Sequence, residues 1–268
     1  MDIRYVGFSK IISLSAAASM ALEKVPAIEA GPHLGTERKI RVLSHNVWCH
    51  YGQQWYSPSG KKRLDCLQNE IVRQSYDVVM LQELFMLRFG PFAITSNFER
   101  LAAELSQHGY RSITDPRKSL PLFGQNSGLV ILSRLPLRMA SAEHVFEQSG
   151  EKVCVKGFVH AQLSLGGEML TVVNTHLDSK AKPKNVQSLQ AQQIRHTVLD
   201  PLLDQVPSAA VLVAGDWNVC SRKTKDDGSA YAHLVQHLSP LRDAYGGIFG
   251  ESELAPTRRP DTKPWVRG

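Results

Sequence analysis

Four hydrophobic stretches of this chain end in polar side chains that could do chemistry. The first two end in an amide and a carboxylate, the third in an imidazole, and the fourth in a carboxylate with a second amide two residues later. These candidate residues are Asn46, Glu83, His176, Asp216 and Asn218. Polar groups that follow hydrophobic strands at one edge of a layered domain meet in one cleft. We therefore predict that the five side chains form a single site.

The residue types of this set predict which metal it would hold. Carboxylate and amide oxygens dominate the set and it contains no thiolate, which suits Mg²⁺, with Mn²⁺ or Ca²⁺ as alternatives, better than zinc. A hard cation held by few carboxylates completes its coordination with water and phosphate oxygens, so the set indicates phosphoryl-group chemistry.

Each candidate residue also has a structural explanation when it is taken alone. Glu83 could be a solvated surface carboxylate, because most carboxylates are exposed. Asp216 followed by Asn218 is typical of a turn or a helix cap. His176 could be a half-buried packing residue. The occurrence of all of them together, each after a hydrophobic stretch, favours the site.

Length and composition exclude several classes of protein. The chain has 268 residues, 43% hydrophobic and 21% charged, which excludes a disordered, collagen-like or coiled-coil protein. Its net charge of +6 suits an anionic partner, but the basic residues are scattered, so the case for nucleic acid is weak. Four widely spaced cysteines argue against a zinc ribbon or a disulfide-built fold. No hydrophobic run has the about 18 residues of a membrane span.

The N-terminal region differs from the rest of the chain. Residues 1–22 combine early basic residues, a hydrophobic stretch and small residues at Ser19 and Ala21, which predicts a signal peptide and hence secretion. The alternative is an amphipathic or disordered leader on a cytoplasmic or membrane-peripheral protein. Residues 23–37 mix Pro, Gly and charge as a linker does, and we expect the folded domain over 38–268.

Hydrophobic strands and amphipathic helices alternate along the folded region. We expect strands at 39–47, 77–81, 127–132, 156–165, 168–174 and 209–214, and helices at 62–74, 98–107, 186–203 and 231–238. Gly166 and Gly167 separate two adjacent strands and predict a hairpin. A hairpin within such alternation indicates mixed sheets covered by helices, hence a layered α/β domain that is not all-parallel.

Five segments resemble, in order and spacing, motifs of the endonuclease/exonuclease/phosphatase superfamily, which has the deoxyribonuclease I-like fold. The segments are SHNV (44–47), LQELF (81–85), SGLVILSRLP (127–136), NTHL (174–177) and GDWN (215–218). The resemblance extends from about Arg38 to the C-terminus. It implies a four-layered α-β-β-α sandwich of two mixed sheets.

Within the superfamily, the chain is most similar to neutral, magnesium-dependent sphingomyelinases. The likeness lies in KGFV (156–159) after a short cysteine-containing loop and in the segments 227–238 and 241–245. It implies phospholipase C-type hydrolysis of sphingomyelin to ceramide and phosphocholine, with a sphingolipid or phospholipid substrate at a membrane surface. Lys156 taken alone could equally be a solvated lysine at a strand edge.

The resemblance also implies a role for each candidate residue. Glu83 corresponds to the magnesium ligand, with Asn46 beside it as a second ligand and catalytic residue. His176 corresponds to the imidazole that stabilises the phosphoryl oxygens in the transition state. Asp216 and Asn218 correspond to the pair that contacts the phosphate and holds the nucleophile or leaving group in line.

One motif of the superfamily is missing from the sequence. Its members end in an Asp-His motif that supplies the general base, whereas this sequence contains no Asp-His pair. We therefore expect the final strands to be lacking, with an unpaired sheet edge in their place. A general base contributes about 10²–10⁴-fold, so we expect weak or no activity unless the chain is a fragment.

Two other functions remain open at this stage. The first is a nuclease or another phosphodiesterase of the same superfamily, because specificity depends on loops that vary within one fold. The second is a non-catalytic protein that binds a phosphorylated ligand.

Overall fold

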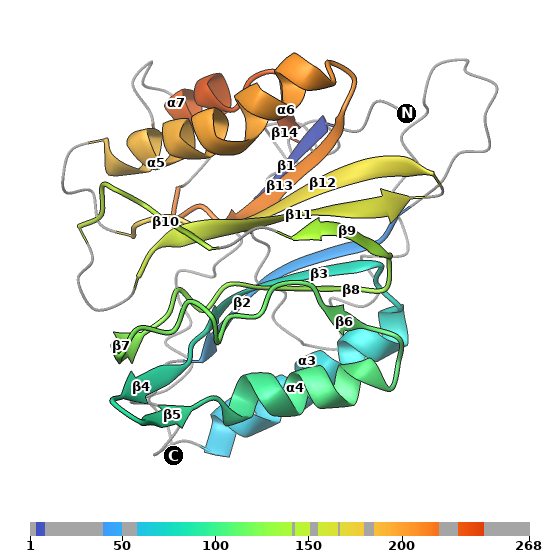
Figure 1. Ribbon diagram of the computed structural model, residues 1–268, viewed down its shortest axis with the longest axis vertical. Helices are drawn as coiled ribbons and strands as arrows, with labels where there is room; N and C mark the ends of the chain where they lie inside the picture. The colour runs from blue at the N-terminus through green and yellow to red at the C-terminus, as the bar shows by residue number, and fades with distance from the viewer. Residues whose placement is uncertain are drawn as a thin grey trace, which may run out of the picture.

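The hydrophobic strands that carry the candidate residues belong to two stacked sheets in the computed structural model (Figure 1). The structure describes residues 4–8, 40–49, 58–140, 143–150, 155–165, 167–179, 185–219 and 230–243. Within them the layers follow the order helices, sheet, sheet, helices. This order confirms the predicted four-layered α-β-β-α sandwich of two mixed sheets.

The larger sheet has seven strands with mixed pairing. Its strands are β10 (His144–Val145), β11 (Gly157–Leu165), β12 (Glu168–His176), β13 (Ala210–Asp216), β1 (Arg4–Phe8) and β14 (Arg242–Asp243), in this order, with β9 (Leu137–Ala140) also paired to β11. The predicted hairpin is confirmed, because β11 and β12 pair in antiparallel register. β13 runs parallel to β12, so these two strands end at the same edge.

The second sheet contains the strands that carry the first two candidate residues. Its order is β2 (Val42–Cys49), β3 (Val78–Leu84), β8 (Val130–Ser133) and β6 (Arg111–Ser112). β2 and β3 pair in parallel, whereas β8 is antiparallel to β3. A separate small sheet consists of β5 (Phe92–Ile94), β4 (Leu87–Phe89) and β7 (Phe123–Gln125). The sequence did not predict this small sheet, because three-residue strands are too short to show alternation.

Helices cover the outer face of each of the two large sheets. They are α3 (Pro58–Gln74), α4 (Ser96–Ser106), α5 (Val186–Ile194), α6 (Asp200–Gln205) and α7 (Ala230–His237). The single helix predicted over 186–203 is interrupted by a π-helical turn at Arg195–Leu199, just before Pro201. Pro201 has no N–H to continue an α-helical ladder. None of the described helices is both long and hydrophobic enough to span a bilayer.

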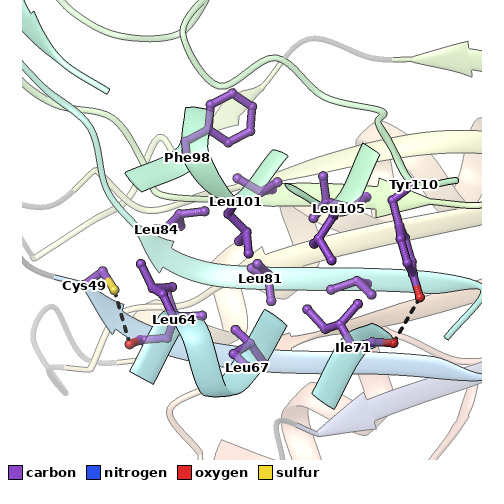
Figure 2. Close-up of a cluster of buried hydrophobic side chains, with 14 of the residues drawn as sticks. Cys49, Leu64, Leu67, Ile71, Leu81, Leu84, Phe98, Leu101, Leu105 and Tyr110 are labelled. Carbon is purple, nitrogen blue, oxygen red and sulfur yellow. Dashed lines mark hydrogen bonds between the residues drawn. The ribbon is translucent and has the colours of Figure 1, made fainter. Parts of the chain in front are cut away.

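The packing between α3, α4 and the second sheet explains why these segments are helical. Leu64, Leu67 and Ile71 recur at spacings of three and four, so they share one face of α3. Figure 2 shows these side chains beside β3, with Leu101 and Leu105 of α4 in the same cluster. All five are at most 5% exposed, which makes this one of the chain's main hydrophobic cores.

A pair of buried amides fastens the two sheets together near the candidate residues. Gln82 Nε2 donates to Asn174 Oδ1 at 2.7 Å, between a strand of each sheet. Asn174 Nδ2 in turn donates to the carbonyl oxygens of Leu81 at 2.8 Å and Val130 at 3.0 Å. Each such hydrogen bond contributes about 1 kcal/mol, and a buried amide left without one costs more. The pair therefore fixes how the two sheets face each other.

Strand β1 pairs with β13 along all five of its residues, from Arg4 opposite Val211 to Phe8 opposite Gly215. Because β12 pairs with its other side, β13 is paired along both of its edges. β1 lies within the predicted signal peptide, so removal of residues 1–22 would uncover one of these edges. The rest of that leader and the predicted lack of final strands concern residues outside the described ranges.

Candidate active site

Four of the five candidate side chains meet at the rim where β2, β3, β12 and β13 end. Asn46 Nδ2 donates to Glu83 Oε1 at 2.9 Å and to Asp216 Oδ2 at 2.8 Å. His176 Nε2 lies 3.7 Å from Glu83 Oε1 and 3.8 Å from Asp216 Oδ2. Residues from four separate strands are thus within direct contact of one another.

The fifth candidate, Asn218, lies beside this group and holds its backbone. Its side-chain Nδ2 donates to the carbonyl oxygen of Leu177 at 2.8 Å, and its backbone N–H donates to Asp216 Oδ1 at 3.1 Å. Asn218 therefore ties the end of β12 to the end of β13 and orients the Asp216 carboxylate. A contact between Asn218 and phosphate stays a prediction.

Strand alternation explains how three of these side chains come to face the same space. Successive side chains of a strand point to opposite faces, so every second residue faces the other sheet. On β12, Leu170 and Val172 pack between the sheets, and His176 continues their phase. On β13, Ala214 packs there and Asp216 continues that phase. Asn46 is likewise in phase with Val42, which packs against the same cluster.

Glu83 is out of phase with this pattern, and its backbone conformation corrects the difference. Val79 and Leu81 pack on the helix side of β3, so regular alternation would direct residue 83 there too. Glu83 instead has φ of +60°, a left-handed conformation that L residues rarely adopt. Such a conformation costs about 1–3 kcal/mol and is typical of functional sites. It brings the carboxylate to Asn46 and His176.

Gly128 supports this unusual backbone from the neighbouring loop. A Cβ atom at Gly128 would lie 3.0 Å from the Cα of Glu83 and 3.0 Å from the backbone nitrogen of Leu84. The Leu84 N–H donates to the Gly128 carbonyl at 3.0 Å. The glycine in the motif at 127–136 therefore allows the loop to approach and hold the residue after Glu83.

Asn46 presents its amide nitrogen to the carboxylates because its oxygen is already bonded. Asn46 Oδ1 accepts a hydrogen bond from the Trp48 backbone N–H at 2.9 Å. In this orientation Asn46 links the two carboxylates, and its Oδ1 is directed to the backbone. Its role as a metal ligand stays a prediction.

The donor atoms at the rim fit a divalent cation. One ligand atom from each of Glu83, His176 and Asp216 lies within 4.8 Å of the others. Two carboxylates this close repel each other when both are charged, and their side chains are only 12% and 22% exposed. A cation between them would remove that repulsion. Mixed nitrogen and oxygen ligands do not by themselves decide which divalent ion this is.

Lys156 is part of the site, although the sequence left its role open. Lys156 is 4% exposed, and its Nζ lies within hydrogen-bond distance of His176 Nε2, at 2.8 Å. The interpretation as a solvated lysine at a strand edge is therefore wrong. The KGFV segment was the only signal for this residue, because its partner lies 20 positions away. Lys156 therefore adds a basic side chain to the group around His176.

Replacing Lys156 with Met separates its electrostatic role from its packing role. Burying an ammonium costs solvation energy, so Lys156→Met should leave the melting temperature unchanged or raise it. Phosphodiester hydrolysis should nevertheless fall by about 10–100-fold, because a charge that stabilises phosphoryl oxygens is lost. Steady-state kinetics and thermal unfolding of the same sample measure both effects. Full activity in the Met variant would make Lys156 a packing residue only.

Comparisons with known proteins agree with the fold. Residues 43–260 match the model of the Endonuclease/Exonuclease/phosphatase family. A search of curated proteins gives no match. The solved structure of sphingomyelinase C from Streptomyces griseocarneus is similar, with a TM-score of 0.55 and 21% identity over 75% of this chain and 70% of that chain.

Two further solved structures share the fold. A mutant beta toxin from Staphylococcus aureus with bound magnesium ions has a TM-score of 0.59 and 19% identity, over 75% of this chain and 70% of that chain. An endonuclease/exonuclease/phosphatase family protein from Leptotrichia buccalis has a TM-score of 0.54 and 17% identity, over 74% of this chain and 73% of that chain. Since the family match covers most of the sequence, the chain belongs to the Endonuclease/Exonuclease/phosphatase family.

Proposed function

We propose that this protein is a metal-dependent phosphodiesterase that hydrolyses sphingomyelin to ceramide and phosphocholine. Membership of the family makes it a hydrolase-type protein, since members are generally metal-dependent hydrolases. The main observation behind the proposal is that four polar side chains contact one another at one rim, namely Glu83, Asn46, His176 and Asp216. The choice of sphingomyelin draws further support from the KGFV segment and from the fold shared with a sphingomyelinase C.

The proposed reaction is a single displacement at phosphorus. A water oxygen forms a bond to phosphorus, the bond from phosphorus to the ceramide oxygen breaks, and the proton lost by the water passes to the departing oxygen. His176 and Lys156 supply hydrogen-bond donors and positive charge for the phosphoryl oxygens. Among Glu83, His176 and Asp216, the Asp216 side chain is the most exposed, at 22%, so it is the carboxylate that solvent water reaches best.

Glu83 and Asp216 are the carboxylates that would hold a divalent cation, with Mg²⁺ as our proposal, whereas His176 keeps its role as a donor to phosphate. When bound, such an ion neutralises the phosphate charge that grows in the transition state. The magnesium ions in the beta toxin structure support a divalent metal in this fold. Asn46 keeps the two carboxylates together through its amide nitrogen.

The proposal is tested by offering the protein two substrates side by side. Sphingomyelin vesicles and plasmid DNA are incubated with the protein and Mg²⁺, and released phosphocholine and DNA strand breaks are measured. We expect Mg²⁺-dependent phosphocholine release that EDTA abolishes. DNA cleavage without phosphocholine release would make the protein a nuclease, and Mg²⁺-dependent ligand binding without either product would make it a non-catalytic binder.

Secretion is part of the proposal and rests on the signal peptide predicted over 1–22. N-terminal sequencing of protein recovered from the culture medium tests it, because a leader that is retained contradicts cleavage.

A further inference from the structure

Four large hydrophobic side chains stand exposed at the free end of the small sheet β5-β4-β7. We call this group the hydrophobic tip; its members are Phe89 (57% exposed), Phe92 (76%), Leu122 (62%) and Phe123 (68%). The small sheet lies at one end of the molecule, away from the helices of the larger sheet (Figure 1). Exposed hydrophobic side chains gathered in this way mark a site of interaction.

The strand register shows that the phenylalanines form one row. Phe89 on β4 lies directly opposite Phe92 on β5 and directly opposite Phe123 on β7. Residues opposite each other in a sheet share a face, so the three rings lie side by side. The chain at Leu122, just before Phe123, is held to the turn between β4 and β5, because its carbonyl accepts a hydrogen bond from the Gly90 N–H at 2.9 Å. The tip is thus built into the sheet.

The charge around the tip favours a phosphate-bearing surface. Residues 84–98 and 116–142, which build the tip and its supports, contain no Asp or Glu. They do contain Arg88 next to the row and the exposed Lys118 four positions before Leu122. Of the carboxylates next to these ranges, Asp115 lies near Lys118 but is paired with Arg117, and Glu143 is partly buried beside Ser119. Hydrophobic side chains flanked by cations match a bilayer surface, where acyl chains lie beneath a layer of phosphates.

The size of the tip argues for lipid over a protein partner. A stable protein interface takes about 20–30 residues from each side, whereas the tip presents four. A few inserted side chains, in contrast, are enough for reversible attachment to a bilayer when electrostatic attraction adds to them.

The tip also stands next to the candidate active site. β4 begins four residues after Glu83, and β7 ends three residues before Gly128, whose backbone holds the Glu83 turn. Phe89 lies six positions after Glu83, which corresponds to at most about 20 Å of extended chain. A membrane that receives the tip would therefore have its headgroups close to the site.

We propose that the hydrophobic tip inserts into the lipid–water interface and thereby brings lipid phosphodiesters to the catalytic rim. The second part of this inference, the delivery of lipid phosphodiesters, rests on the proposed function. The first part, attachment to lipid, can be measured without catalysis. It assigns membrane recognition to residues 87–94 and 120–125, next to Glu83 in the chain.

The test uses a triple variant, Phe89→Ser, Phe92→Ser and Phe123→Ser. The control is a second triple variant on the helical layer that covers the larger sheet: Leu189→Ser, Val206→Ser and Val235→Ser. The replaced residues are 41%, 40% and 36% exposed. Binding is measured by flotation with vesicles of phosphatidylcholine and sphingomyelin, with and without phosphatidylserine, in the presence of EDTA. Hydrolysis of the soluble ester bis(p-nitrophenyl) phosphate with Mg²⁺ reports the site itself.

We expect the tip variant to bind vesicles at least about tenfold more weakly than the unsubstituted protein, whereas the control variant binds normally. Hydrolysis of the soluble ester should be the same in all three proteins, and circular dichroism should show the same fold. Sphingomyelin hydrolysis in vesicles should fall with vesicle binding.

Two results would overturn the inference. One is equal vesicle binding by the tip variant and the unsubstituted protein, or no binding by either. The other is concentration-dependent self-association in sedimentation that the tip variant loses, without vesicle binding, which would assign the tip to a second copy of the chain. Vesicle binding through the tip together with no hydrolysis of either ester would instead refute the proposed function and leave the tip assignment intact.

Discussion

Replacing Glu83 with Gln is expected to lower phosphodiester hydrolysis at least about a thousandfold, relative to the activity of the unsubstituted protein. Glu83→Gln keeps the size of the side chain but removes one of the two carboxylates of the triad. It also replaces the charged acceptor that Asn46 Nδ2 contacts at 2.9 Å. The affinity for Mg²⁺ should fall with the charge, so the Mg²⁺ concentration for half-maximal rate should rise. Kinetics over a Mg²⁺ series and calorimetric titration measure both.

A matched control separates this effect from a general loss of carboxylate charge. Glu104→Gln makes the same chemical change at an exposed position of α4, outside the site. We expect it to leave both the rate and the Mg²⁺ dependence unchanged. The melting temperature of Glu83→Gln should equal or exceed that of the unsubstituted protein, because the substitution removes repulsion between two nearby carboxylates. Retention of most of the rate at saturating Mg²⁺ would refute the assignment of Glu83.

The meeting of Asn46, His176 and Asp216 could be predicted because it follows from local rules. Each residue is in phase with hydrophobic residues that face the other sheet, and each lies where its strand ends. Period-two alternation and strand ends are both visible in a sequence. The layered fold was predictable for the same reason, since long periodic segments alternate along the chain.

Glu83 and Lys156 show where such reasoning stops. The phase of β3 alone would direct the Glu83 side chain toward the helices, and only a left-handed backbone brings it to the site. No sequence rule signals a positive φ at a glutamate. The burial of Lys156 depends on His176 of the adjacent strand, and single-residue properties of lysine point to the surface instead.

Pairing across long distances in the chain was the other part that the sequence did not reveal. β1 pairs with β13, more than two hundred positions away in the chain. β1 has only five residues and lies in a segment that also resembles a signal peptide, so nothing in its sequence indicates which strand it pairs with. The hydrophobic tip was missed for a different reason, because three-residue strands show no period.

Among the glycines that the structure describes, Gly215 of the GDWN motif is expected to be the least tolerant of a methyl group. A Cβ atom there would lie 1.9 Å from the carbonyl oxygen of Thr175, and φ at Gly215 is +155°. Thr175 is its register partner on β12, so neither backbone can move away without breaking the sheet. Gly215→Ala should therefore lower the free energy of unfolding by about 4 kcal/mol or more. Urea unfolding followed by circular dichroism measures this loss.

Gly167→Ala is the matched control for Gly215→Ala, because Gly167 also has a positive φ, of +99°, but has nothing within 4 Å of its hypothetical Cβ. It should cost only the backbone strain, about 1–2 kcal/mol. The difference between the two variants isolates the contact between β12 and β13 that sets Asp216 beside His176. Equal losses in both would mean that strain alone, and not close approach of the strands, requires glycine in this motif.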